Sequence, residues 1–372
     1  MRADMSAVVN EVLTEIRGQV GFITLNRPAA LNALTLQMIR DLTTCLLAWR
    51  DDSRVQAVAI RGSNKAGPFG AFCAGGDIRF FHQALLSGDP GPEDFFTEEY
   101  TLNHLIHTYP KPYIAFMDGI VMGGGMGISQ GASHRLVTPR TKMAMPETVI
   151  GLFPDVGGGY FLSRRPGHTG EWLALTGTTL EGAQALPLGL ADRLLPVEHL
   201  VPLWNALAKL EAFDKASIDA LIATFSVADS PVDTWARGQI DQCFSQPTVT
   251  AIVQALTQDA SDWAQQATAQ MRQRSPLMLH VTLEQLRRAR QMTLAQALRQ
   301  ERDMMRHVFF PRHLGRHGAQ TEVAEGIRAL AIDKDNLPAW QPARLEDVTA
   351  AMVLPFFDSP WPECSHPLRM LS

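Results

Sequence analysis

Cysteine is scarce in this chain of 372 residues, and its four positions are scattered. They are Cys45, Cys73, Cys243 and Cys364. No two of them form a C-x-x-C pair, so the sequence predicts neither a disulfide framework nor a zinc site. We therefore expect a reducing, cytoplasmic environment and no bound metal.

The chain also lacks an excess of positive charge and any long apolar run. Its formal net charge is -5, and a nucleic-acid partner is not expected, because phosphate binding usually leaves a basic footprint. The most apolar stretch, Tyr113 to Ile128, is interrupted by Asp118 and several glycines. It falls short of the roughly 20 apolar residues of a membrane-spanning helix, so no membrane partner is expected. Acidic residues near the start, Asp4 and Glu11 among them, fit neither a secretory signal nor an arginine-rich transit peptide.

The residues that are present predict a compact α/β protein. Hydrophobic residues make up 46% of the chain and charged residues 19%, which is typical of a globular domain. Four short apolar segments in the first two hundred residues predict strands, at Phe22–Leu25, Val55–Ile60, Tyr113–Phe116 and Arg135–Val137. Between the first two, apolar residues recur at helical spacing at Leu36, Ile39, Leu42, Leu46 and Trp49. Asn32 or Thr35 could cap that helix. The alternation of strands and helices favours right-handed crossover units in an α/β arrangement.

Strand signals disappear after about residue 200. Segments such as Leu283–Arg306 are rich in Arg, Gln and Leu and predict helices. We therefore divide the chain into an α/β core at 12–205, which holds the functional site, and a mainly helical region at 206–372. The proline-rich end, Pro355–Pro367, is expected to be loosely ordered.

Two glycine-rich loops interrupt the α/β pattern, at Gly62–Asp77 and Asp118–Gly127. The second contains three consecutive glycines, Gly123 to Gly125, between a predicted strand and a predicted helix. Free backbone amides at such a helix start favour negative charge, including the oxyanion that forms on a carbonyl under attack. Close packing of helix on strand is the structural alternative. Neither loop fits G-x-G-x-x-G or a Walker loop, so a dinucleotide or nucleoside triphosphate is not expected.

Two carboxylates stand among apolar residues, Gly and Pro in the segment 143–160. They are Glu147 and Asp155. Burial raises the pKa of a carboxyl group toward values useful for proton transfer, and two such groups can divide the roles of acid and base. The structural alternative makes Glu147 a first-turn helix residue and Asp155 the cap of a helix that begins near Gly157.

A match to the nucleophile elbow G-x-S-x-G occurs at Gly127–Gly131, with Ser129 as the serine. That elbow requires a strand that ends directly at the motif. Here the predicted strand ends about ten residues earlier, and Ser129 falls inside a predicted helix. A serine nucleophile is therefore not favoured.

Taken together, these segments resemble the crotonase superfamily. The motifs are Leu25-Asn26-Arg27-Pro28, Leu31-Asn32-Ala33-Leu34, Ala74-Gly75-Gly76-Asp77-Ile78, Lys111-Pro112, Asp118-Gly119 and the triple glycine. The resemblance implies a spiral of strand–strand–helix turns completed by C-terminal helices, which often mediate homo-oligomers. It implies a small acyl-coenzyme A substrate and no separate cofactor, because coenzyme A is part of the substrate.

Within the superfamily the chain is most similar to 3-hydroxyisobutyryl-CoA hydrolases. The motifs are Ala144-Met145-Pro146-Glu147-Thr148, Gly151-Leu152-Phe153-Pro154-Asp155-Val156-Gly157-Gly158-Gly159-Tyr160, Glu325-Gly326-Ile327-Arg328-Ala329 and Ile332-Asp333-Lys334-Asp335. The resemblance implies hydrolysis of a short 3-hydroxyacyl thioester, as in valine degradation. Glu147 would act as base or nucleophile, assisted by Asp155.

The resemblance also assigns binding roles. The amides of Gly76 and Gly124 would form the oxyanion hole. Residues expected to bind substrate or coenzyme A are Arg27, Phe72, Cys73, Ala74, Asp77 and Gly123. Ala29 stands where relatives often carry a lysine near the coenzyme A phosphates, and Arg27 could compensate.

One position favours hydrolysis over hydration. Hydratases of the superfamily usually carry a second glutamate just after the triple glycine, where this chain has Gly127. Two other functions stay open. The chain could be an enoyl-CoA isomerase or hydratase, or a non-catalytic coenzyme A-binding homologue.

Overall fold

The computed structural model describes residues 10–227 and 235–372. Asp4, which entered the prediction about targeting, lies outside these residues. Within them, a six-stranded sheet has the order β1-β2-β3-β4-β6-β9, and a three-stranded sheet has the order β5-β7-β8. The strands are β1 Val12–Arg17, β2 Val20–Leu25, β3 Ala57–Gly62, β4 Tyr113–Met117, β5 Ile120–Met122, β6 His134–Val137, β7 Lys142–Ala144, β8 Leu180–Glu181 and β9 Arg193–Leu194.

The chain winds as a spiral between the two sheets. Strand β4 joins the large sheet and β5 the small one, and β6 and β7 repeat this pattern. From β2 to β9 the neighbours in the large sheet are parallel, whereas β1 pairs with β2 as an antiparallel hairpin. Strands β5 and β7 are also parallel. The predicted α/β spiral of strand–strand–helix turns is confirmed.

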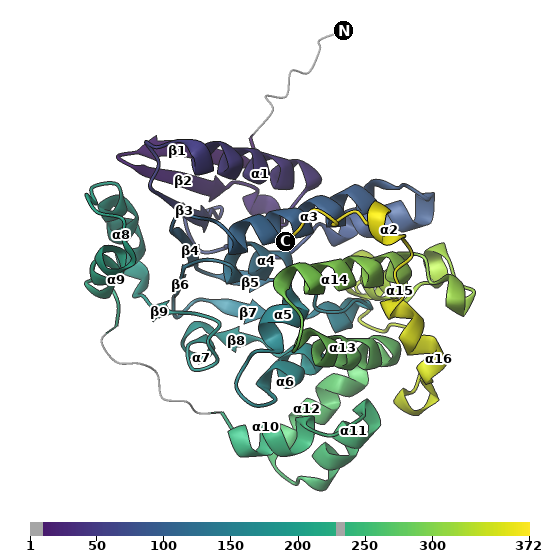
Figure 1. The fold of residues 1–372 in the computed structure, drawn as a ribbon. Helices are drawn as coiled ribbons and strands as arrows, with labels where there is room; N and C mark the ends of the chain where they lie inside the picture. The colour runs from purple at the N-terminus through teal and green to yellow at the C-terminus, as the bar shows by residue number, and fades with distance from the viewer. Residues whose placement is uncertain (1–9, 228–234) are drawn as a thin grey trace.

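Helices surround the sheets and form most of the second half of the chain (Figure 1). In the first half they are α1 Leu36–Asp51, α2 Ile78–Ser87, α3 Gly91–His107, α4 Gly124–Gln130, α5 Gly158–Leu162, α6 Thr169–Thr176 and α7 Gly182–Ala185. The later helices are α8 Leu200–Leu207, α9 Lys215–Ala223, α10 Arg237–Phe244, α11 Val249–Gln258, α12 Asp262–Gln273, α13 Pro276–Ala289, α14 Leu294–Phe309, α15 Glu322–Ile327 and α16 Ala350–Val353. Two further turns matter for the site, the 3-10 helix η2 Glu147–Ile150 and the π-helical turn η6 Arg328–Ile332. None of the helices in the described ranges combines the length and apolar character needed to cross a membrane.

Strands β2, β3 and β4 of the large sheet are buried on both faces, whereas most of the edge strand β1 is exposed. In β3, Ala57 and Ala59 belong to one apolar cluster, whereas Val58 and Ile60 belong to the other, because side chains alternate along a strand. Helices α8 and α9 cover the first face (Figure 1), where Trp204 lies against Phe22 and Phe116.

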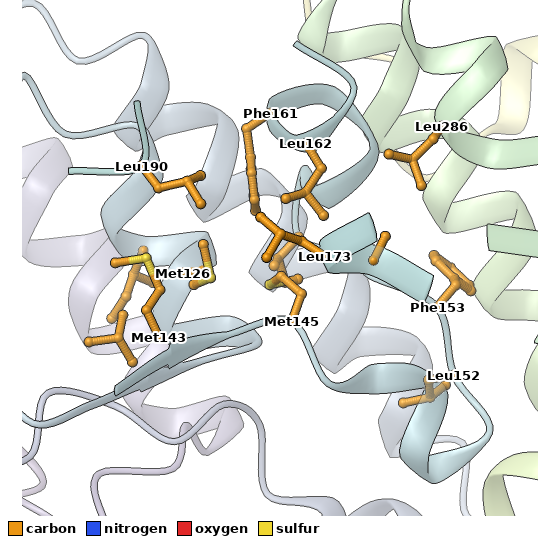
Figure 2. Packing of buried hydrophobic residues seen from close by; sticks show 14 of the residues in the cluster. Met126, Met143, Met145, Leu152, Phe153, Phe161, Leu162, Leu173, Leu190 and Leu286 are labelled. Carbon is orange, nitrogen blue, oxygen red and sulfur yellow. The ribbon is translucent and has the colours of Figure 1, made fainter. Parts of the chain in front are cut away.

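The main core lies between the sheets and the helices on the other side. It runs continuously from the first strand to the C-terminal segment, since Val12 and Leu368 belong to the same apolar cluster. Figure 2 shows a part of it, in which Met126 of α4, Met143 of β7 and Leu173 of α6 are labelled. The helical second half and the α/β first half therefore share one core.

The strongly patterned elements agree with the sequence prediction. Helix α1 begins after Thr35, whose side chain accepts a hydrogen bond from the Met38 amide. The predicted strand at Val55–Ile60 is displaced, because β3 begins at Ala57 and ends at Gly62. The sequence prediction omitted β1 and the short strands β5, β7, β8 and β9.

The proline-rich end is not loose, contrary to the prediction. The Arg299 side chain of α14 donates hydrogen bonds to the carbonyl oxygens of Leu368 and Leu371. His366 is buried beside Asp303, at 3.2 Å between Nε2 and Oδ1. Proline fixes the chain direction here, while side chains of α14 hold the segment in place.

Trp204→Ala should lower the free energy of unfolding by about 3–5 kcal/mol, because it leaves a large cavity under the covered face of the sheet. Val201→Ala on the same helix is the matched control, since Val201 is 46% exposed, and it should change the value by about 0.5 kcal/mol or less. Urea unfolding of both variants measures the difference. Equal effects would show that α8 is not fixed to the sheet through Trp204.

Candidate active site

A pocket of about 330 Å³ opens between the two glycine loops and the segment that carries the predicted carboxylates. Six residues predicted for the site line it, namely Ala74, Gly76, Gly123, Gly124, Glu147 and Asp155. Most of the remaining wall is apolar, formed by Ile78, Phe81, Phe95, Phe96, Met122, Val149, Ile150, Leu152, Val156 and Leu330. The structure thus brings together six predicted residues that are spread from Ala74 to Asp155, and adds Leu330 from the far end of the chain.

The two glycine loops meet at the floor of this pocket. The Met122 amide donates to the Cys73 carbonyl at 3.0 Å, so the first loop runs beside β5. Gly75 and Gly123 both have positive φ, 105° and 49°, which favours glycine. Among the described residues, neither the Gly76 amide nor the Gly124 amide donates a backbone hydrogen bond outside the regular helices and strands. Two free N–H groups on adjoining loops suit an oxyanion.

Glu147 lies at the start of η2, directly after Pro146. The structural alternative predicted that Glu147 lies in the first turn of a helix, and this is correct for its backbone. The residue also lines the pocket, as the functional prediction requires. Its Oε1 lies 2.8 Å from the position that a Cβ on Gly123 would occupy. Its Oε2 is buried without a hydrogen-bond partner among the described residues. Burial, and then the charges of Asp155 and Glu301, raise the pKa of Glu147 well above its ordinary value.

Asp155 has a different environment from Glu147. The Tyr100 hydroxyl of α3 donates a hydrogen bond of 2.7 Å to Asp155 Oδ2. Burial raises the pKa of Asp155 to about 6, and the Tyr100 bond opposes that rise. Gly157, not Asp155, is the cap of α5. The two carboxyl groups therefore differ in proton affinity, as acid and base partners require.

A third carboxyl group, Glu99, lines the pocket and was missed by the sequence prediction. It is 2% exposed, and its Oε1 has no hydrogen-bond partner in the described ranges. Burial, followed by the charges of Asp155 and Glu147, raises the pKa of Glu99 well above its ordinary value. The signal was present in the sequence, because Glu99 lies at helical spacing on the same face as Phe95, Phe96 and Leu102.

The other four predicted binding residues lie beside the pocket, outside its lining. Phe72 and Cys73 are fully buried, and their amides donate to the Ile120 carbonyl. Asp77 caps α2 and forms an ion pair of 2.8 Å with Arg27. Arg27 also pairs with Glu11 at 3.2 Å, so its guanidinium is already engaged by two carboxylates. Binding of coenzyme A by these four residues stays a prediction.

Gly127 and Ser129 of α4 are enclosed by protein. A Cβ on Gly127 would lie 2.7 Å from Val156 Cβ and 2.9 Å from Asn103 Nδ2. The space that a second glutamate would need is therefore filled. Ser129 is fully buried and donates to the Gly125 carbonyl within its own helix, which argues against a serine nucleophile.

Comparison with known proteins agrees with this fold. A family model described as enoyl-CoA hydratase/isomerase matches residues 20–357, and the chain belongs to that family. It is 40% identical over 356 residues to the mitochondrial 3-hydroxyisobutyryl-CoA hydrolase of Danio rerio, covering 94% of this chain and 90% of the relative. It is 36% identical over 357 residues to 3-hydroxyisobutyryl-CoA hydrolase 1 of Arabidopsis thaliana, covering 94% and 92%. A crystal structure of a carnitinyl-CoA dehydratase from Mycobacterium thermoresistibile superposes with a TM-score of 0.84 at 38% identity, covering 94% and 97%.

Replacing Glu99 by Gln should stabilise the protein increasingly as the pH rises. A carboxyl whose pKa is raised by folding contributes stability below its unfolded pKa, and loses that contribution as the pH rises through its folded pKa. The difference in free energy of unfolding, variant minus wild type, should grow between about pH 5 and about pH 8. Urea unfolding across that range measures it, with Glu211→Gln, an exposed glutamate, as control. Equal pH trends in both variants would contradict the prediction.

Proposed function

We propose that the chain hydrolyses 3-hydroxyisobutyryl-CoA or a closely similar short 3-hydroxyacyl thioester. The observation that carries the proposal is the buried Glu147, which lines the same pocket as Gly76 and Gly124 and has one carboxyl oxygen without a hydrogen-bond partner among the described residues. The two hydrolase relatives quoted above support the same reaction.

The thioester carbonyl oxygen binds between the amides of Gly76 and Gly124. These dipoles are fixed by the fold before substrate arrives, so they stabilise the developing oxyanion without reorganisation. Glu147 then either removes a proton from attacking water or attacks the carbonyl carbon itself. In the first route the water oxygen bonds to carbon as the C–S bond breaks. In the second, the C–S bond breaks to give an anhydride, which water hydrolyses.

Asp155 assists the departing sulfur. The thiolate of coenzyme A requires a proton, and a carboxyl group with a pKa near neutrality can carry one. Glu99 lies on the α3 side of the same pocket and can accept a hydrogen bond from the hydroxyl of a 3-hydroxyacyl group. The apolar wall then surrounds the short carbon chain of the substrate.

Coenzyme A is part of the substrate, and no separate cofactor is proposed. The thioester end of the substrate enters the pocket beside Ala74, which lies in the same loop as Phe72 and Cys73. Arg27 is held in two ion pairs, so we propose that it shapes this loop through Asp77 as well as offering charge to phosphate. A homo-oligomer formed through the C-terminal helices stays a prediction.

A second function, addition or removal of water at a double bond, is favoured by one observation. Glu99 and Glu147 place two carboxyl groups in one pocket, and hydration requires an acid and a base. The solved relative named as a carnitinyl-CoA dehydratase fits that chemistry. Against it, Gly127 leaves the usual second position without a carboxylate.

The first experiment is release of free thiol from 3-hydroxyisobutyryl-CoA, with hydration of crotonyl-CoA followed in parallel.

Glu147→Gln should reduce thiol release by about a hundredfold or more, because it removes the base. It should leave the melting temperature unchanged or raise it, because it also removes a buried ionisable group. Asp155→Asn should also reduce release. Hydration without thiol release in the wild type would establish the second function. Isomerisation of a 3-enoyl thioester that is indifferent to Asp155→Asn would indicate an isomerase, and binding without turnover a non-catalytic protein.

Gly127→Glu should not create a hydratase. Its Cβ would collide with Val156, next to Asp155, so thiol release should fall at least tenfold with no gain of crotonyl-CoA hydration. Gly238→Ala in α10 is the matched control, because nothing lies within 4 Å of its Cβ, and helix propensity alone should stabilise it by up to about 1 kcal/mol. A rise in hydration in Gly127→Glu would show that the helix can make room for a second acid.

The cytoplasmic location expected from the sequence also stays a prediction. The Danio rerio relative is named as a mitochondrial protein. Fractionation of the source cells and detection of the native chain would separate the two locations.

A further inference from the structure

The segment after Asp155 forms a tight turn of unusual backbone geometry. Val156 and Gly157 both have positive φ, 53° and 87°, and Val156 is a β-branched residue for which that conformation is costly. The Gly158 amide donates back to the Asp155 carbonyl at 2.6 Å. Such a turn persists only where its surroundings hold it.

A buried carboxylate from the helical region holds this turn. Glu301 of α14 accepts the Gly157 amide on Oε2 at 2.7 Å and the Gly159 amide on Oε1 at 2.9 Å. On the other side of Asp155, the Gln285 side chain of α13 donates to the Pro154 carbonyl at 2.8 Å. The same Gln285 nitrogen lies 3.2 Å from Glu301 Oε1, which joins the two contacts.

We propose that Glu301, together with Gln285, is a positioning residue that fixes Asp155 relative to Glu147 and thereby sets the rate of the proposed hydrolysis. The inference rests on the proposed function, since it concerns the same pocket. Glu301 itself does not line the pocket and does not touch the site of the reacting atoms. Its contacts reach the backbone on one side of Asp155, and those of Gln285 reach the other side.

The chemistry of the contact requires a carboxylate in particular. Each of its two oxygens receives one backbone N–H, and a glutamine has only one acceptor atom in that place. The amide NH2 of a glutamine would therefore face one of the two N–H donors. Release of either glycine amide would leave a buried donor unpaired and would free the turn to relax.

Glu301 also acts on the pocket through its charge. The titratable groups that interact with it from other elements are Tyr100 of α3, Glu147 of η2 and Asp155. Burial raises the pKa of Glu301 to about 8, and the Gly157 and Gly159 amides oppose that rise because they stabilise the ionised form. Once ionised, Glu301 adds to the raised pKa of Glu147, after burial and Asp155. Neutralising it should therefore lower the pKa of Glu147, so that the ionised base is present at lower pH.

The test is Glu301→Gln, assayed by thiol release from 3-hydroxyisobutyryl-CoA across pH. We expect kcat to fall about tenfold to a hundredfold with a smaller change in KM, because misplacement of about 1 Å can cost a hundredfold. The limb of kcat that rises with pH should move to lower pH. The control is Glu171→Gln in α6, which removes another buried glutamate, one that pairs with Arg290 away from the pocket. It should lower the melting temperature without moving that limb.

Each outcome is decisive. Absence of thiol release in the wild type refutes the proposed function, whereas wild-type kcat and pH profile in a folded Glu301→Gln refute the positioning role alone. If Glu301→Gln does not fold, Gln285→Met replaces it, since this change removes the donor to Pro154 and keeps the side-chain length. A folded Gln285→Met with wild-type kcat would equally overturn the inference, and a reduced kcat with unchanged melting temperature would support it.

Discussion

Burial of several carboxyl groups in one small volume is the constraint on which the rest of this structure depends. Glu99, Glu147, Asp155 and Glu301 are all buried, and each has a raised pKa with burial as its largest cause. Asp155 accepts from the Tyr100 hydroxyl and Glu301 from two glycine amides, whereas Glu99 and Glu147 each have one oxygen without a partner among the described residues. Arg302, the next residue after Glu301, turns away to Glu93. Unpaired buried charge is costly, so burial favours the neutral form of these groups, an effect that the Tyr100 hydroxyl opposes at Asp155 and the glycine amides oppose at Glu301.

The sequence was sufficient to predict those elements whose side chains follow a clear period. Helix α1 and strands β2, β4 and β6 have such patterns and were placed within about a residue or two at each end. Strands β5, β7, β8 and β9 have only two or three residues, too few to show alternation. Their existence depends on pairing with distant strands, which a single sequence does not reveal. The end at Pro355–Pro367 was predicted to be loose because composition does not reveal the side chains of α14 that hold it.

The site was predictable where its chemistry depends on short motifs. The glycine loops and the pair Glu147 and Asp155 stand out against apolar neighbours, and the structure places them around one pocket. Glu99 was hidden because acidic residues are common in helices, and only its position on an apolar face distinguishes it. Glu301 carries no local signal, since it lies in a charged helix 146 residues beyond Asp155 in the printed sequence. Its contact with Gly157 is purely tertiary.

The packing around Glu147 explains the motif at Glu325-Gly326-Ile327-Arg328-Ala329 and Ile332-Asp333-Lys334-Asp335. A Cβ on Gly326 of α15 would lie 2.4 Å from the backbone carbonyl carbon of Ile150. A Cβ on Gly151 would lie 2.3 Å from the backbone carbonyl oxygen of Glu322. The backbones of α15 and η2 therefore touch at two glycines, where no side chain fits between them. Arg328 closes the motif by binding Glu325, Asp333 and Asp335. The turn that presents Glu147 is thus supported by α15, just as the turn that presents Asp155 is held by α14. Because both supports come from the last third of the chain, the spiral alone would have its glycine loops but no rigid placement for either carboxylate.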